Sequence, residues 1–203
     1  MKKQFFEIEK DGFYGTYYEN PNGSDCAFIG LFGDDPNDYM AKCGAKWLHK
    51  NGVNVLCVSP GKKNYSHVNN PLERIETAIG WLKSNGNRKI GIMGMSTAGM
   101  DSLVAASFFL DITLTFALTA SDFVWQGFEQ GNKDGCKEWP VPGTSTLSWK
   151  GEPLRSDCAP RRCTNGTFHS CSHSRRTHFP VRRKGRSPGR SIPKKQGNTR
   201  KRK

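Results

Sequence analysis

Four apolar runs divide the first 120 residues into short segments separated by longer amphipathic stretches. They are CAFIGLF (26–32), VNVLCV (53–58), KIGIMGM (89–95) and ITLTFALTA (112–120). The first three are almost uninterrupted, which is typical of strands buried on both faces of a parallel sheet. We therefore expect four sheet strands at these positions.

The stretches between these runs have the spacing of helices. Apolar residues recur every three or four positions over 38–50 and again after Asn70, and a third helix is expected over 97–109. Asn70 is the expected N-cap of the second helix, with Pro71 at its first position. The stripes expected to be buried are Met40, Cys43, Trp47 and Leu48 in the first helix, and Leu72, Ile75, Ile79 and Leu82 in the second.

The start of the chain has a different pattern. FFEIEKDGFYGTYYEN alternates and contains Asp11-Gly12, which predicts an antiparallel hairpin with strands near 4–9 and 12–19. The alternation of strands and helices that follows implies right-handed crossovers and helices on both faces. The predicted fold class is α/β: a doubly wound, mostly parallel sheet of α/β-hydrolase type with an N-terminal antiparallel hairpin, truncated before the later strands.

The composition changes abruptly near residue 155. Residues 151–203 carry 16 of the 31 Lys and Arg residues but only two of the 18 acids, so the net charge of +13 comes entirely from this segment. It also has few large apolar side chains, too few to offset the entropy of ordering the chain. We predict a hydrolase domain over 1–154 and a basic, disordered tail over 155–203, most simply explained as out-of-frame translation.

The N-terminus and the cysteines bear on localisation. MKKQFFEIEK lacks the apolar core of a signal peptide, and no stretch approaches the roughly 18 apolar residues of a membrane-spanning helix. The cysteines of the body lack the spacing of a disulfide framework, and those of the tail, with its histidines, match no common zinc pattern. A cytoplasmic protein without membrane partner, metal or cofactor is expected.

Ser96 is the candidate nucleophile. Gly94-Met95-Ser96-Thr97-Ala98 follows an apolar strand and opens a helix, which is the context of the G-x-S-x-G turn of α/β-hydrolases, here with Ala98 at the last position. The alternative is a serine that only caps the helix. The backbone N–H of Thr97 and one from the loop at Gly33 are candidate oxyanion donors, although Gly33 also suits an ordinary turn.

Two long blocks carry a family resemblance: FIGLFGDDPNDYMAKCGAKWLHKNGVNVLCVSPG and NPLERIETAIGWLKSNGNRKIGIMGMSTAGMDSLVAASFFLDITLTFALTASDFVWQGFEQG. They resemble bacterial members of the acyl-CoA thioester hydrolase / bile acid-CoA:amino acid N-acyltransferase C-terminal domain family. The resemblance covers about residues 1–154. It implies a Ser or Cys nucleophile with an Asp and a His, acting on acyl-CoA or other acyl esters and thioesters, and it places the nucleophile at Ser96 and an oxyanion donor at Thr97.

The other triad residues have no clear counterparts. Asp122 is a weak alternative acid, His49 is expected to be a solvated cation at a helix end, and His67 is expected on the surface. We therefore predict that the chain is inactive as written, because Ser96 lacks a base. Two alternatives remain open: another serine esterase or peptidase-like hydrolase, and a non-catalytic protein that binds nucleic acid, if the basic tail is genuine.

Overall fold

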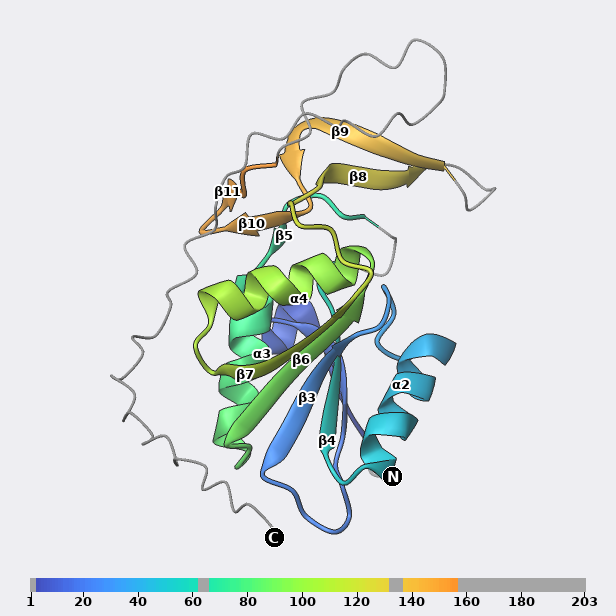
Figure 1. Cartoon of the computed structure of the whole chain (residues 1–203), viewed down its shortest axis with the longest axis vertical. Coiled ribbons are helices and arrows are strands. Elements are labelled where there is room, and N and C mark those ends of the chain that lie inside the picture. Colours follow the sequence, from blue (N-terminus) through green and yellow to red (C-terminus); the bar gives the residue numbers. More distant parts are fainter. Residues whose placement is uncertain (1–2, 62–65, 132–136, 157–203) are drawn as a thin grey trace, which may run out of the picture. The chain divides into compact units, whose positions relative to one another are not determined.

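The computed structural model describes residues 3–61, 66–131 and 137–156, all within one compact unit, Met1–Thr167. The predicted tail therefore lies, apart from Arg155 and Ser156, outside the described residues. The central element is a six-stranded sheet in the order β1-β2-β4-β3-β6-β7 (Figure 1). Its strands are β1 (Lys3–Phe6), β2 (Tyr14–Tyr18), β3 (Cys26–Leu31), β4 (Asn54–Ser59), β6 (Lys89–Met95) and β7 (Ile112–Leu118).

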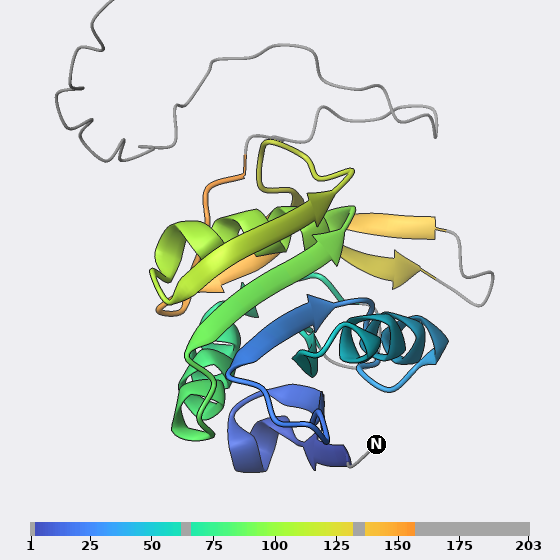
Figure 2. The ribbon, with the colours of Figure 1, turned by 60° about the horizontal axis from the view of Figure 1, so that its bottom comes forward.

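The pairing of these strands confirms the predicted fold class. β4, β3, β6 and β7 are parallel to one another, whereas β1 pairs with β2 and β2 with β4 in antiparallel register. The crossovers between the parallel strands are α2 (Tyr39–Lys50), α3 (Glu73–Ser84) and α4 (Thr97–Phe108). Figure 2 shows the strands stacked from β7 at one edge to the N-terminal hairpin at the other, with helices on both sides.

Each face of the sheet has its own core. Leu56 and Val58 of β4 belong to the larger core, beneath α3 and α4. Val55 and Cys57, their neighbours along the same strand, belong to the smaller core beneath α2. Both faces of β4 are buried because successive strand residues point to opposite sides, which explains the continuous apolar run in the sequence.

The N-terminal hairpin is confirmed as an antiparallel pair, but its connection is not the tight turn that the sequence predicts. Between β1 and β2 lies one helical turn, α1 (Ile8–Asp11), which ends at Gly12 in the left-handed conformation with φ 79°. The Asp11 carboxylate accepts a hydrogen bond from the Glu7 N–H at 2.8 Å across this turn. Asp11-Gly12 therefore ends a helix, a role that a left-handed glycine fills as readily as a hairpin turn.

The predicted start of the second helix is wrong. Asn70–Pro71 forms the short strand β5, and α3 begins after Leu72. β5 pairs in parallel with β10 (Leu147–Trp149), which pairs with β11 (Glu152–Pro153) in antiparallel register. Asn70 thus pairs with Leu147, 77 residues later in the chain, and no local sequence pattern predicts this pairing. The apolar face predicted for this helix is confirmed, with Leu72, Ile75, Ile79 and Leu82 all buried.

Of the stripe predicted for α2, only Leu48 is confirmed as buried. Met40 and Trp47 are 50% and 60% exposed and Cys43 is also exposed, whereas Ala41, Ala45 and Leu48 are buried. At Gly44, an added Cβ would meet the Phe32 ring. Small residues face the sheet because larger ones would collide with the aromatic side chains, Phe28 and Phe32, that pack beneath α2.

Two more strands lie between β7 and β10 in the chain. They are β8 (Gln126–Gly131) and β9 (Lys137–Ser145), which pair in antiparallel register. No alternating pattern marked them in the sequence. Among the described residues, no helix is long and apolar enough to cross a membrane.

Candidate active site

Ser96 lies at the junction of β6 and α4 in a backbone conformation that non-glycine residues rarely adopt. Its φ and ψ are 57° and −125°. Its N–H donates to the Leu118 carbonyl at 2.9 Å, and its carbonyl accepts from the Met100 N–H at 3.1 Å. Such a conformation costs of the order of 1–3 kcal/mol and persists only where the surrounding structure enforces it.

The geometry of Ser96 argues against an ordinary helix cap. A capping serine has extended backbone and accepts a hydrogen bond from the first turn with its side chain. Ser96 occupies the N-cap position of α4, but its φ is positive and its side chain makes no capping hydrogen bond. The residue is exposed, so its hydroxyl stands at the surface of the sharp turn.

Two glycines allow the turn to be this tight. A Cβ at Gly94 would run into the Ala98 carbonyl and lie 2.8 Å from the Ser102 hydroxyl. A Cβ at Gly99 would lie 2.9 Å from the Leu118 carbonyl oxygen. The close approach that the motif requires after the nucleophile therefore occurs at Gly99 rather than at Ala98, which explains why alanine is tolerated there.

The candidate oxyanion donors lie, like Ser96, at the carboxyl end of the parallel strands. Thr97 is the first residue of α4, and amides in a first helical turn have no intrahelical acceptor. Gly33 follows β3, which pairs in parallel with β6 so that Leu31 lies opposite Gly94. Its φ of 154° lies outside the range that L residues favour. The loop at Gly33 and the turn at Ser96 therefore leave neighbouring strands at the same end.

His67 is buried, contrary to the expectation of a surface residue. It is 9% exposed, and its Nε2 lies 3.3 Å from Oδ1 of Asp34, the residue after Gly33. Its ring stacks on Phe128 of β8 with 4.7 Å between ring centroids, and the backbones of His67 and Phe128 form a bridge. A pairing with a strand 61 residues away, invisible in the sequence, buries this loop residue.

Asp101 is a second buried acid close to His67. It lies on α4, is 1% exposed, and neither carboxyl oxygen has a hydrogen-bond partner within the described part of the chain. Burial raises the pKa of Asp101 from 3.8 to about 7, against an opposing effect of the charge on His67. A carboxyl group without donors favours its neutral form because the ionised form loses its hydration.

Among the described residues, no contact brings the remaining candidates, Asp122 and His49, to Ser96. Asp122 is exposed in the segment after β7, and its carboxylate takes part in no hydrogen bond or ion pair between described residues. His49 lies at the end of α2, where its Nε2 is 3.1 Å from the Glu19 carbonyl oxygen. Within the described ranges, the side chain of Ser96 has no hydrogen bond to a histidine, and no group of His, Cys, Asp and Glu could hold a metal ion.

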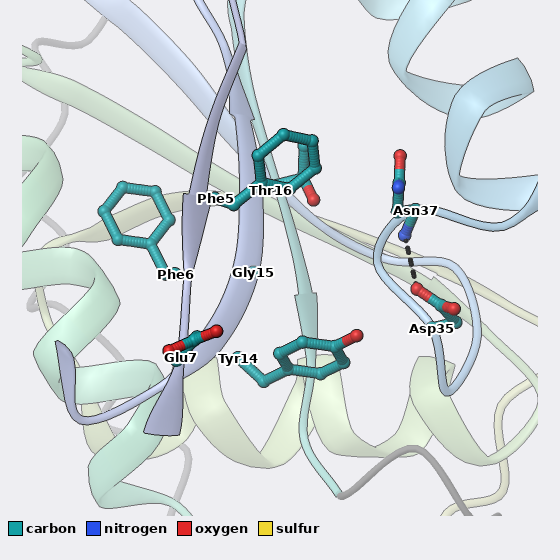
Figure 3. Close-up of a pocket in the computed structure, with 8 residues that line it drawn as sticks. All are labelled: Phe5, Phe6, Glu7, Tyr14, Gly15, Thr16, Asp35 and Asn37. Carbon is teal, nitrogen blue, oxygen red and sulfur yellow. Dashed lines mark hydrogen bonds between the residues drawn. The ribbon is translucent and has the colours of Figure 1, made fainter. Parts of the chain in front are cut away.

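A pocket of about 280 Å³ lies between the loop that follows β3 and the strands β1 and β2 (Figure 3). Asp35 and Asn37 of this loop line it, joined by a hydrogen bond from the Asn37 N–H to the Asp35 carboxylate at 2.9 Å. The other lining residues belong to β1, β2 and their connection, namely Phe5, Phe6, Glu7, Tyr14, Gly15 and Thr16. Neither Ser96 nor Thr97 lines this pocket, so it is separate from the candidate nucleophile.

Sequence reasoning missed the pairing of Asp34 with His67 and the burial of Asp101. One signal was present: Asp101 lies in an otherwise apolar stretch, one position from Met100 and three from Val104, both buried. An acid on the buried stripe of a helix is rare unless it is paired or has a function. The proximity of His67 to Asp34 had no signal, because it depends on β8.

Comparisons with known proteins give a partial structural likeness. No protein-family model matches the sequence, and no curated protein matches it. Among solved structures, the chain is similar to Est1E from Butyrivibrio proteoclasticus, with 17% identity and a TM-score of 0.44 over 58% of this chain and 51% of that one. A second structure, Est1E with bound ferulic acid, gives 20% identity and a TM-score of 0.42 over 56% of this chain and 51% of that one.

The α/β hydrolase GrgF from Penicillium sp. sh18 is also similar, with 22% identity and a TM-score of 0.45 over 59% of this chain and 45% of that one. The matched part thus spans about half the length of these solved structures.

Proposed function

We propose that this chain carries the nucleophile of a serine hydrolase that acts on acyl esters or thioesters, with Ser96 attacking the acyl carbonyl. The observation that supports this most is the positive φ of Ser96 between a buried strand and a helix. A strained non-glycine residue at the carboxyl end of a parallel strand is typical of a functional position, because selection for stability alone would favour glycine.

The reaction would take place at the carboxyl end of the parallel strands, where Ser96, Thr97 and the Gly33 loop lie. The Ser96 hydroxyl would lose its proton to solvent as Oγ bonds to the acyl carbon, and the carbonyl oxygen would take up negative charge. As the C=O bond re-forms, the C–O or C–S bond would break, the leaving group would take up a proton as an alcohol or thiol, and water would then hydrolyse the acyl-enzyme. The N–H groups of Thr97 and of the Gly33 loop would stabilise that oxygen, aided by the positive end of the α4 dipole. Acyl-CoA thioesters are the proposed substrate class, as the resemblance of residues 1–154 implies, and another serine esterase or peptidase-like activity is the alternative.

We also propose that turnover by this chain is slow. Attack by a serine requires a base, and none of the described histidines is hydrogen-bonded to Ser96. An oxyanion hole and substrate binding without a triad leave roughly 10³–10⁴-fold acceleration over water. A single acylation of Ser96 is therefore expected to be easier to detect than repeated turnover.

A transition-state analogue tests the nucleophile in a single bond-forming step, in which water or buffer takes up the serine proton. An alkylboronic acid accepts the serine oxygen at boron, with loss of the hydroxyl proton, and forms an anionic tetrahedral adduct. We expect saturable binding of octylboronic acid to the full chain, followed by ¹¹B NMR, and its loss in Ser96→Ala. Asp111→Asn, which removes an exposed ion pair to Lys83, is the matched control.

The result that would overturn the proposal is wild-type protein that forms no adduct, or an adduct that survives in Ser96→Ala. Rates with acyl-CoA thioesters and p-nitrophenyl esters then separate the proposed substrate class from its alternative. Nucleic-acid binding by 155–203 remains an alternative from composition alone. It predicts an affinity that falls steeply with salt and disappears when these residues are deleted.

A further inference from the structure

Three buried titratable side chains from distant parts of the sequence lie near one another: Asp34 pairs with His67, and the charge of His67 acts on Asp101. They are Asp34 from the loop after β3, His67 from the segment before β5, and Asp101 from α4; we call them the acid–imidazole cluster. The side chains of Asp34 and His67 are 9% and 11% exposed, and their Oδ1 and Nε2 atoms are 3.3 Å apart. The proposed chemistry uses none of the three, although burying such groups carries a large desolvation cost.

His67 is the most firmly fixed member of the cluster. Its N–H donates to the Phe128 carbonyl at 2.9 Å, and its carbonyl accepts from the Phe128 N–H at 3.0 Å. Its ring stacks on the Phe128 ring with only 22° between the two planes. The imidazole is therefore held by both backbone and ring contacts, which keep its Nε2 in a fixed position 3.3 Å from Oδ1 of Asp34.

Asp34 connects that fixed imidazole to the loop that contains Gly33. The far end of this loop is fixed separately, because Asp38 caps α2 by accepting from the Ala41 N–H at 2.7 Å. Gly33 itself has no Cβ and a φ of 154°, so local sterics do little to hold it. The contact between the Asp34 and His67 side chains lies one residue after Gly33. It can therefore fix the peptide groups on either side of this glycine.

We propose that His67 is a positioning residue for the oxyanion site: its contact with the Asp34 carboxylate holds the Gly33–Asp34 backbone at the end of the parallel strands where Ser96 emerges. The inference rests on the proposed function, since it concerns the same oxyanion site. His67 touches neither the substrate nor Ser96 in this role. It acts through Asp34 on the direction of a backbone N–H.

Asp101 links the cluster to the helix that follows Ser96. It lies five residues after Ser96 on α4, and the charge of His67 favours ionisation of its carboxyl group. Asp101 thus adds a buried acid near the imidazole on the helix that begins at Thr97, whereas the 3.3 Å contact of the imidazole is with Asp34.

The test measures octylboronic acid affinity in the full chain with paired variants. Asp34→Ala removes the acceptor, whereas Asp34→Asn keeps an oxygen that can accept from Nε2–H. His67→Ala and His67→Gln form the corresponding pair at the donor. Removal of one oxyanion donor costs roughly 10²–10³-fold in rate, so a donor that is displaced and not lost is expected to weaken binding by about 10-fold.

The positioning role predicts that both alanine variants lose about 10-fold in affinity and that Asp34→Asn and His67→Gln recover most of it. Urea unfolding of each variant verifies that it is folded, and the two conservative variants keep the test usable if an alanine variant unfolds. Asp111→Asn is expected to bind as wild type does.

The outcomes separate the two proposals. If Ser96→Ala abolishes binding while His67→Ala and Asp34→Ala bind as tightly as wild type, the positioning role is overturned and the nucleophile assignment stands. Equal losses in the alanine and the conservative variants also overturn it, because the polar contact between Asp34 and His67 then has no specific role. If the wild-type chain binds no boronic acid, the proposed function itself fails.

Discussion

Replacing Asp101 with asparagine should change how the stability of this protein depends on pH. Asp101 is wholly buried on α4, and its carboxyl oxygens accept no hydrogen bond from any described residue. The variant keeps the shape of the side chain and removes only its ability to ionise. It therefore isolates the linkage between one proton and folding.

The direction in which the free energy of unfolding changes with pH follows from the raised pKa of Asp101. Burial raises the pKa of Asp101 from 3.8 in the unfolded chain to about 7 in the folded one. Between these values the folded state holds a proton that the unfolded state has lost, so the free energy of unfolding falls as pH rises. Each pKa unit corresponds to 1.36 kcal/mol, so a shift of about three units amounts to roughly 4 kcal/mol between pH 4 and pH 8.

Urea unfolding of wild type and Asp101→Asn from pH 4 to pH 8 measures this directly. The difference in unfolding free energy between variant and wild type should rise by about 4 kcal/mol in favour of the variant across that range. A constant offset from the buried amide does not affect the result. The same experiment on Asp111→Asn, at an exposed ion pair, should give a flat difference of less than about 1 kcal/mol.

A flat difference for Asp101→Asn would refute the reasoning. It would mean that Asp101 ionises equally in the folded and unfolded chain, and hence that donors to its carboxylate exist in the folded protein. The link from Asp101 to His67 would then need a different physical basis.

Three further substitutions test the turn at Ser96 and a buried amide. Gly94→Ala should lower the unfolding free energy by roughly 3 kcal/mol, because the new Cβ would strike the Ala98 carbonyl. Ser96→Gly should be about 1 kcal/mol more stable than Ser96→Ala, because glycine relieves the strain at φ 57°. Asn54→Ala should cost about 2–4 kcal/mol by leaving the Asn20 N–H, to which its side chain is bonded at 2.8 Å, without its acceptor.

Each of these has a clear contradicting result in chemical denaturation. Wild-type stability of Gly94→Ala would show that the turn is looser than described. Equal stability of the glycine and alanine variants at position 96 would show that the residue is not strained. A loss below about 0.5 kcal/mol for Asn54→Ala would show that water replaces the buried amide.

The β7 edge of the sheet predicts self-association. Leu114, Phe116 and Leu118 alternate along this strand and are 55%, 53% and 43% exposed, since α2 covers only β3 and β4 on this face. Exposed apolar edge strands favour aggregation. Phe116→Glu should lower the aggregated fraction in sedimentation velocity, with Leu110→Glu, at an exposed site outside the strand, as control. An equal effect of both would attribute the association to apolar surface in general.

Elements defined by local pattern could be predicted. The buried strands appear as continuous apolar runs, and β6 spans the predicted 89–95. The apolar face of α3 was correct because large side chains at helical spacing have no other place to be buried. The turn at Ser96 was also predictable, since a glycine before the serine and small residues after it permit a close approach between strand and helix.

Elements defined by distant contacts could not. Most of the stripe predicted for α2 was wrong because the Phe32 ring packs against Gly44 on the face that the helix covers, so Ala41 and Ala45 are buried in place of Met40 and Trp47. Asn70, followed by Pro71, has the local sequence of a helix cap. Its actual partner, Leu147, lies far along the chain and leaves no signal near Asn70. Likewise, β8 buries His67, which the sequence alone places in an exposed loop.

The sequence by itself therefore determined the α/β class, the alternation of strands and helices, and the place of the candidate nucleophile. These depend on periodicity and on side-chain size within a few residues. The tertiary structure decided which polar groups become buried and which acids meet an imidazole. Desolvation and pairing are set by whatever packs around a group, and for Asp34, His67 and Asp101 those neighbours come from three separate parts of the chain.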